Sequence, residues 1–457
     1  MELAILIVFV VGYICIAAEH PLKIDKAATA LLTGVACWAL LAVGTHVLPA
    51  HLAHDFETAS QLEGHTLSLP EFFDHRLLHH LQEIASILLF LMGAMTIVEV
   101  VDSHEGFRVI TDRITSTNKV KLLWIFGIIT FFLSAALDNL TTAIVMVSLS
   151  RKLISDQKTR WFFGGIIVIA ANAGGAWSPI GDVTTTMLWI GKQITSASII
   201  KEIFLASLIN LLVPLIFLSF VLKGNVSRPE LKENDGHGAT GRERGIAFFL
   251  GVGGLMFVPV FKTITHLPPF MGIMFSLGIL WVVTELLHNG KEAEHKSKFS
   301  ALHALRKIDM PSVLFFLGIL LAVGALQEIG HLGTLAVFLK EQLNDVYAIN
   351  IAIGLLSAVV DNVPLVAASM NMYPVSASAI GDGWADMFVQ DGPFWHFLAY
   401  CAGTGGSILI IGSAAGVAVM GLEKIDFLWY MKKISIWGLI GYLAGAAVYI
   451  VEMMLLH

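Results

Sequence analysis

Long apolar runs are the feature that most constrains how this chain can fold. They recur along all 457 residues, and each is about 17 to 25 residues long, enough for a helix to cross the ~30 Å hydrocarbon core of a bilayer. Only 14% of the residues are charged, against roughly 25% in an ordinary soluble domain. A transmembrane barrel would instead show short segments of alternating polarity. The sequence therefore predicts an all-α polytopic membrane protein.

The N-terminal run has the apolar core of a signal peptide but no basic residues in front of it, so we expect it to be kept as the first span. Two further apolar stretches, 122–150 and 346–371, differ from the rest because an Asp-Asn pair interrupts each near its middle. The spans that we expect cover roughly 2–18, 27–48, 84–101, 161–193, 202–222, 246–262, 270–287, 312–328, 394–421 and 434–456.

Positive charge predicts how the chain is threaded, because cytoplasmic loops carry an excess of Lys and Arg. Basic residues flank 122–150 on both sides, so both of its ends should be cytoplasmic. We therefore expect a re-entrant hairpin with Asp138-Asn139 at its tip, enclosed by protein. The stretch 346–371 has few basic neighbours and should enter from outside. Most of the 28 Lys and Arg then lie in predicted cytoplasmic loops over 19–26, 102–121, 151–160, 223–245, 288–311 and 422–433.

Two parts of the chain resemble each other at nearly constant offsets. The segment SAALDN (134–139) corresponds to SAVVDN (357–362) at an offset of 223. Downstream, a Gly-Gly pair and a later Gly in 174–181 correspond to the same pattern in 405–412 at an offset of 231. Paired interrupted helices in inverted repeats indicate a transporter site at the repeat interface. We therefore predict two inverted-topology repeats, each with a re-entrant helical hairpin and a broken transmembrane helix.

The predicted organisation has four parts. They are N-terminal spans and a His-rich outer loop over 1–83, a first repeat over 84–222 with its broken helix at 161–193, linking loops and spans over 223–311, and a second repeat over 312–457 with its broken helix at 394–421. Histidine titrates near neutral pH, so the outer loop at 49–83 could sense pH, although a solvated loop is the simpler reading. Its histidines are His51, His54, His65, His75, His79 and His80.

The Asp-Asn tips are the first candidates for function. A carboxylate at membrane depth costs on the order of 2.5–3.5 kcal/mol, so it persists where it has a partner or a task. Carboxylate, amide and hydroxyl oxygens suit hard cations such as Na⁺ and Li⁺, by extension from the preference of hard divalent ions. The alternative is that Asp138 and Asp361 simply cap the helices that follow them.

The segment AANAGGAWSPIGDVTTT (170–186) is the second candidate, because its glycines and proline should break the helix and free backbone carbonyls for a cation. Asn172, Asp182 and Thr184 would add side-chain oxygens, although small residues can also serve close helix packing. The counterpart in the second half offers the hydroxyls of Thr404 and Ser407 but no carboxylate. Two serines lie one turn before the tip aspartates, and each could serve the site or bond back to its own helix.

Four segments resemble the NhaD-type sodium/proton antiporters, within a larger ion-transporter superfamily of inverted-repeat carriers. They are SAALDNLTTAIVM (134–146), NAGGAWSPIGDVTTTMLW (172–189), SAVVDNVPLVAASM (357–370) and GTGGSILIIGSAAGVAVMG (403–421). The SPIGDVTTTMLW stretch is the most specific of these. The resemblance implies exchange of cytoplasmic Na⁺ or Li⁺ for external H⁺, a task in pH homeostasis. It also implies that polar residues of these segments form or adjoin the ion site.

The expected mechanism is competition at one site. A buried carboxyl group favours its neutral, protonated form, and a bound cation favours the charged form, so the two ligands exclude each other. Together with alternating access this suffices for antiport, without any cofactor. We expect Na⁺ or Li⁺ at Asp138, Asp361, Asn172 and Asn362. The full predicted ion and proton site comprises Asp138, Asn139, Asn172, Asp182, Thr184, Ser357, Asp361, Asn362, Thr404 and Ser407.

Two other classes of function stay open on the sequence alone: an anion carrier for a carboxylate or arsenite, and an intramembrane aspartyl protease. The chain has no nucleotide-binding loop, no HExxH motif and no basic patch for nucleic acid. We expect Na⁺, Li⁺, H⁺ and membrane lipids as partners, and a homodimer is conceivable. The lack of an Arg- and Ser-rich leader favours a bacterial inner membrane, with an organelle envelope left open.

Overall fold

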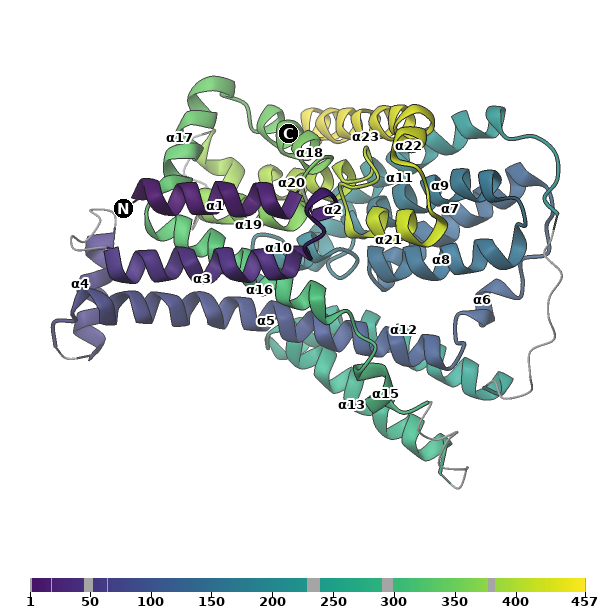
Figure 1. The fold of residues 1–457 in the computed structure, drawn as a ribbon, viewed down its shortest axis with the longest axis horizontal. Coiled ribbons are helices and arrows are strands. Elements are labelled where there is room, and N and C mark those ends of the chain that lie inside the picture. The colour runs from purple at the N-terminus through teal and green to yellow at the C-terminus, as the bar shows by residue number, and fades with distance from the viewer. Residues whose placement is uncertain are drawn as a thin grey trace. The chain divides into compact units, whose positions relative to one another are not determined.

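The structure, a computed structural model, describes residues 2–17, 19–44, 52–63, 65–227, 239–289, 299–376 and 383–456. Regular secondary structure in these ranges is helical throughout. The elements are α1 (Glu2–Ala17), α2 (Glu19–Leu22), α3 (Lys26–Gly44), α4 (Ala53–Glu63), α5 (Leu69–Ser103), α6 (Arg108–Thr111), α7 (Lys119–Ala136), α8 (Asn139–Leu153), α9 (Gln157–Ala176), α10 (Val183–Ile190), α11 (Ser196–Val221), α12 (Gly241–Thr265), α13 (Pro269–Leu287), α15 (Ala301–Leu305), α16 (Met310–Glu328), α17 (His331–Leu343), α18 (Val346–Ser357), α19 (Asn362–Met372), η2 (Ala385–Phe388), α20 (Pro393–Gly405), α21 (Ala414–Glu423), α22 (Phe427–Lys433) and α23 (Ser435–Leu456) (Figure 1).

Eight of the described helices are long and apolar enough to cross a membrane. They are α3, α5, α7, α11, α12, α13, α16 and α23. The prediction of an all-α polytopic membrane protein is therefore confirmed. The expected first span is the shorter apolar helix α1, and helix α7 supplies the first arm of the predicted hairpin at 122–150.

The chain forms two compact units. The first unit comprises 1–89, 309–345 and 363–375, and the second comprises 90–308, 346–362 and 376–457. Every residue of the predicted ion site belongs to the second unit.

In the first unit, α16 packs along α3, and α1 packs against α3 in turn (Figure 1). The indole Nε1 of Trp38 on α3 donates to the carbonyl oxygen of Leu321 on α16 at 2.8 Å. The ammonium group of Lys26 lies 4.4 Å from the ring centre of Phe315, in cation–π geometry. Aromatic and cationic side chains thus join helices that are far apart in the sequence.

Much of the stretch 49–83, predicted as an outer loop, is helical, because α4 and the first turns of α5 lie there. Helix α5 starts early because Glu71 accepts hydrogen bonds from both the backbone N–H and the hydroxyl of Ser68, at 2.8 and 2.7 Å. A carboxylate that reaches back to the residue before the helix is half of a capping box. Of the predicted histidine set, His51 and the side chain of His54 lie outside the described residues.

A buried ion cluster closes the end of α16 in the first unit. The carboxylate of Glu328, which is fully buried, accepts from Arg76 Nε at 3.0 Å and from the Arg76 terminal nitrogen at 2.8 Å. His80 Nε2 lies 2.8 Å from the same carboxylate, and Arg76 also contacts Asp55 at 3.1 Å. Because the charge is paired and hydrogen-bonded on both sides, burial is tolerated, and the cluster ties α4 and α5 to α16.

In the second unit, two apolar helices are interrupted where the glycines and the proline predict it. The first ends at Ala176 and resumes at Val183, and the second ends at Gly405 and resumes at Ala414. Helix α9 packs against α7, α8 and α20, so the two interrupted helices meet in the interior of this unit.

Glycine is required where each interrupted helix meets its neighbour. A side chain at Gly174 would collide with the carbonyl oxygen of Phe131 on α7, and one at Gly405 would collide with the carbonyl oxygen of Gly354 on α18. These pairs stand at the same offsets as the sequence correspondences, 223 for Phe131 and Gly354 and 231 for Gly174 and Gly405. The two halves of the sequence thus make equivalent close contacts.

Glu423, at the end of α21, joins three helices of the second unit. Its buried carboxylate accepts from Arg151 Nε at 2.7 Å and from Arg160 Nε at 2.8 Å. Its backbone carbonyl accepts from Trp161 Nε1 at 3.1 Å. Arg151 lies in the last turn of α8 and Arg160 in the first turn of α9, so one carboxylate fixes the ends of α8, α9 and α21.

Replacing Glu423 with Gln should lower the free energy of unfolding by about 2–3 kcal/mol, because two arginines lose their anionic partner. The loss should fall below the ~5 kcal/mol extreme because Arg151 is 45% exposed and water can solvate it. Thermal unfolding in detergent measures the effect. Glu341→Gln on exposed α17 is the matched control and should change little, and equal melting temperatures for both variants would contradict the assignment.

Candidate functional site

Two predicted site carboxylates cap helices in the second unit. Asp138 precedes α8 and accepts from the Thr141 backbone N–H and hydroxyl, both at 2.7 Å. Asp182 precedes α10 and accepts from the Thr184 backbone N–H at 3.0 Å and its hydroxyl at 2.9 Å. The capping alternative is therefore realised at Asp138, and Asp182 caps its own helix in the same way. Each cap uses only part of the carboxylate's capacity, because an ionised carboxylate offers about four acceptor positions.

Asp182 lies at the centre of a buried polar network. Its Oδ2 accepts from Asn139 Nδ2 at 2.8 Å, and Asn362 Nδ2 lies 3.5 Å away, at the limit of a hydrogen bond. Asn139 begins α8 and Asn362 begins α19, so the Asn of each Asp-Asn pair turns toward the same carboxylate. Asp182 exposes only 2% of its surface. Among the described residues, no Lys, Arg or His forms an ion pair with it.

Asn172 extends this network to the second interrupted helix. Its amide oxygen lies 3.1 Å from Asn139 Nδ2, and its own Nδ2 donates to Ser413 Oγ at 3.0 Å. Ser407 Oγ lies 3.4 Å from the same nitrogen. Asn172 is fully buried on α9, whereas both serines lie around the break between α20 and α21. One carboxylate, three amides and three hydroxyls are thus gathered by hydrogen bonds from both halves of the sequence.

Ser413 is the site residue that sequence reasoning missed. It caps α21 by accepting from the Gly416 backbone N–H at 3.2 Å, as Asp182 caps α10. The offset of 231 that relates the glycine patterns also relates Asp182 to Ser413. The repeat was therefore the sequence signal that could have identified Ser413. It pairs the charged cap Asp182 in the first half with the neutral cap Ser413 in the second.

The serines before the two tips do not bond back to their own helices. Ser134 Oγ donates to the Ala171 carbonyl at 2.6 Å, and Ser357 Oγ donates to the Ala402 carbonyl at 2.9 Å. Both bonds join a tip-bearing helix to the adjacent interrupted helix, again at offsets of 223 and 231. The hydroxyl of Thr404, in contrast, donates to the Tyr400 carbonyl of its own helix at 2.6 Å.

The predicted residues thus fall into two groups. Hydrogen bonds link Asn139, Asn172, Asp182, Thr184, Asn362 and Ser407 in one network. Asp138, Ser357 and Thr404 make the bonds described above, and Asp361 is a half-buried residue that directly precedes α19. In the described part of the chain, no three His, Cys, Asp or Glu side chains gather as a metal centre would require. The network instead consists of neutral amide and hydroxyl groups around one carboxylate.

Comparison with known proteins identifies related transporters. The family described as Citrate transporter matches residues 6–389. Sodium/proton antiporter 1 of Arabidopsis thaliana is 44% identical over 98% of this chain and 72% of its own length. Sodium/proton antiporter 2 of the same plant is 42% identical over 97% of this chain and 98% of its own. The Na(+)/H(+) antiporter NhaD of Vibrio cholerae is 30% identical over 94% of this chain and 87% of its own.

Replacing Ser134 or Ser357 with Ala should each lower the free energy of unfolding by about 1 kcal/mol, the usual net contribution of one hydrogen bond. The two losses should be similar because the two bonds join equivalent helices. Thermal or chemical unfolding in detergent measures them. Thr263→Ala, which removes an exposed hydroxyl bonded to its own helix, is the control. A loss at only one of the two serines would contradict their equivalence.

Proposed function

Because the chain belongs to the NhaD-type sodium/proton antiporters, we propose that it exchanges cytoplasmic Na⁺ or Li⁺ for external H⁺ by alternating access. The single observation that carries this proposal is the buried carboxylate of Asp182, which amides from both Asp-Asn tips surround. The family consists of transporters, which fits the prediction that the chain is not an enzyme.

The chemistry of the Asp182 network supports competition between a cation and a proton. A buried carboxyl group without a cationic partner favours its neutral form, since burial in apolar surroundings penalises the charge. A desolvated Na⁺ or Li⁺ would restore the charged form and would take oxygens from Asn172, Ser407 and Ser413 in place of water. One carboxylate can satisfy either ligand but not both, so entry of one expels the other.

Asp138 and Asp361 extend the proposed site. Each directly precedes an Asn that turns toward Asp182, so a charge on either Asp would act on the same small volume. We place the cation among Asp138, Asp361, Asn172 and Asn362, with Asp182 sharing the proton. Thr184 would hold the Asp182 carboxylate in position through its two hydrogen bonds.

We further propose that 84–222 and 312–457 form two inverted repeats, with hairpins at 122–150 and 346–371 and broken helices at 161–193 and 394–421. The equivalent glycine contacts and serine bonds support this arrangement. The segments 1–83 and 223–311 would complete the transporter as the remaining parts of the chain. The hairpins and broken helices would move as one body against other helices, as in related carriers.

Localisation, ion range and assembly complete the proposal. The apolar helices make this a multi-pass membrane protein, and we place it in a bacterial inner membrane, with plant relatives leaving an organelle envelope open. Transport of Li⁺ beside Na⁺ and assembly as a homodimer belong to the proposal as well.

An anion carrier is the alternative with the same fold. Its site should present cationic side chains or helix N-termini to the substrate, whereas the network around Asp182 presents carboxylate, amide and hydroxyl groups. A membrane protease finds no support among the relatives, which are transporters.

The test is exchange in proteoliposomes that hold a pH dye and an imposed acidic interior. Added NaCl or LiCl should collapse the gradient in the wild type, and Asp182→Asn, Asp138→Asn and Asp361→Asn should each slow the collapse about tenfold or more. Asn is as good a helix cap as Asp, so these variants remove the charge while the helices keep their starts. Their melting temperatures should therefore stay close to that of the wild type.

Glu341→Gln, which removes an exposed charge that takes no part in the hydrogen bonds of the Asp182 network, should transport normally. Full exchange by all three Asp→Asn variants would overturn the site. If neither cation collapses the gradient while succinate or arsenite accumulates in the vesicles, the proposed cation exchange is wrong and the chain is an anion carrier.

A further inference from the structure

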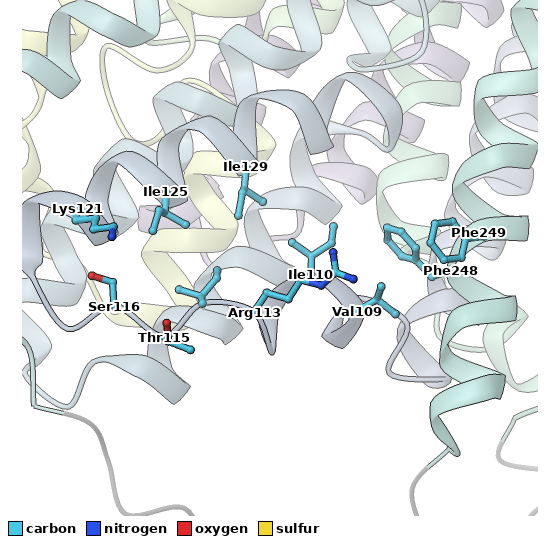
Figure 2. Close-up of a pocket in the computed structure, with 11 residues that line it drawn as sticks. Val109, Ile110, Arg113, Thr115, Ser116, Lys121, Ile125, Ile129, Phe248 and Phe249 are labelled. Carbon is cyan, nitrogen blue, oxygen red and sulfur yellow. The ribbon is translucent and has the colours of Figure 1, made fainter.

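A cavity of about 560 Å³ opens in the second unit, apart from the Asp182 network. Its walls come from α6 and the connection after it, from α7 and from α12 (Figure 2). The lining side chains include none of the predicted ion-site residues. Its volume lies within the roughly 300–1,000 Å³ range of ligand pockets.

One part of the cavity is apolar. Ile125 and Ile129 stand four residues apart on α7 and therefore share one face of that helix. Phe249 on α12 leaves 69% of its surface exposed, beside the buried ring of Phe248. Figure 2 shows these isoleucines and phenylalanines along the walls of the same cavity. Such a surface suits a hydrocarbon chain, because apolar side chains can pack against it by van der Waals contact.

The same cavity also carries positive charge. Arg113 and Lys121 are exposed and line the cavity together with the hydroxyl residues Thr115 and Ser116 (Figure 2). Neither Arg113 nor Lys121 forms an ion pair with any residue that the structure describes.

The acids nearby in the sequence are already paired with other cations. Glu105 contacts both Arg108 and Arg244, and Asp112 contacts Arg108 at 3.5 Å. The ion pairs with Arg108 and Arg244 hold the pKa of Glu105 below its usual value, although burial alone would raise it. The cavity therefore combines two available cations with an uncovered apolar wall.

We propose that this cavity binds an anionic phospholipid of the cytoplasmic leaflet. Its phosphate would pair with Arg113 or Lys121, with Thr115 and Ser116 as hydroxyl partners, and an acyl chain would lie along Ile125, Ile129 and Phe249. Charge complementarity carries the choice of ligand, because basic pockets between membrane helices on the cytoplasmic side bind anionic headgroups. The predicted threading puts the loop over 102–121 on that side. A soluble anion would use the cations but make no contact with the apolar wall.

The test is native mass spectrometry of the purified full chain in a neutral detergent. Phosphatidylglycerol should bind at least about tenfold more tightly than phosphatidylethanolamine with the same acyl chains. The double variant Arg113→Gln/Lys121→Gln should lose that preference. The control Lys432→Gln/Lys433→Gln, which also removes two exposed cations, should keep it.

Two further arms separate a lipid from a soluble anion and guard against misfolding of the double variant. Phe249→Ala alters only an exposed ring, so this variant should fold normally. It should nevertheless bind long-chain phosphatidylglycerol several-fold more weakly than the wild type, because the acyl chain loses part of its wall. Inorganic phosphate should neither bind at comparable concentration nor displace the lipid. Equal binding of both lipids, an effect of the control pair equal to that of the cavity pair, or displacement by inorganic phosphate would each overturn the proposal. None of these readouts depends on ion exchange.

Discussion

Backbone groups that a helix break leaves unbonded must find partners inside an apolar protein, and the interior of the second unit depends on this constraint. At the first break, Ser178 Oγ donates to the Ala135 carbonyl at 2.6 Å, and Thr186 Oγ1 donates to the Pro179 carbonyl at 3.1 Å. At the second break, the Tyr430 hydroxyl donates to the Ser407 carbonyl at 2.9 Å. Side chains of the interrupted segment at the first break, and of α22 at the second, thus hold each break in one conformation, and this fixes where the polar groups of the site stand.

The same constraint explains why the capping role and the proposed transport role of the aspartates coexist. A helix that restarts in an apolar interior needs a hydrogen-bond acceptor at its first turn. A carboxylate supplies that acceptor and still has free acceptor positions on its two oxygens. The first half caps its restart with Asp182 and the second with Ser413. The hydrogen-bonded network therefore carries at most one negative charge, which matches one monovalent cation or one proton.

Much of this fold follows from the sequence. The length of the apolar runs predicted where the spans lie. The glycines together with Pro179 predicted the interruption between Ala176 and Val183. The stretch 49–83 shows what apolar length does not predict. Its low hydropathy argued for a loop, but polarity does not prevent a helix, and the Ser68–Glu71 cap together with the buried Glu328 cluster stabilises helices there. The partners of Glu328 are about 250 residues away in sequence, so no local sequence pattern predicts them.

The candidate site divides in the same way. The sequence by itself determined which residue types stand at the Asp-Asn tips and the breaks, because a polar residue in an apolar run is costly and therefore conspicuous. Only the tertiary structure decided that both tip asparagines turn toward Asp182, that Asn172 bridges to Ser413, and that Thr404 turns back to its own helix. The physical reason is that a hydrogen bond forms over about 3 Å and depends on direction. Sequence offsets relate equivalent positions in two halves, but they do not say which side chains meet when the two interrupted helices pack together.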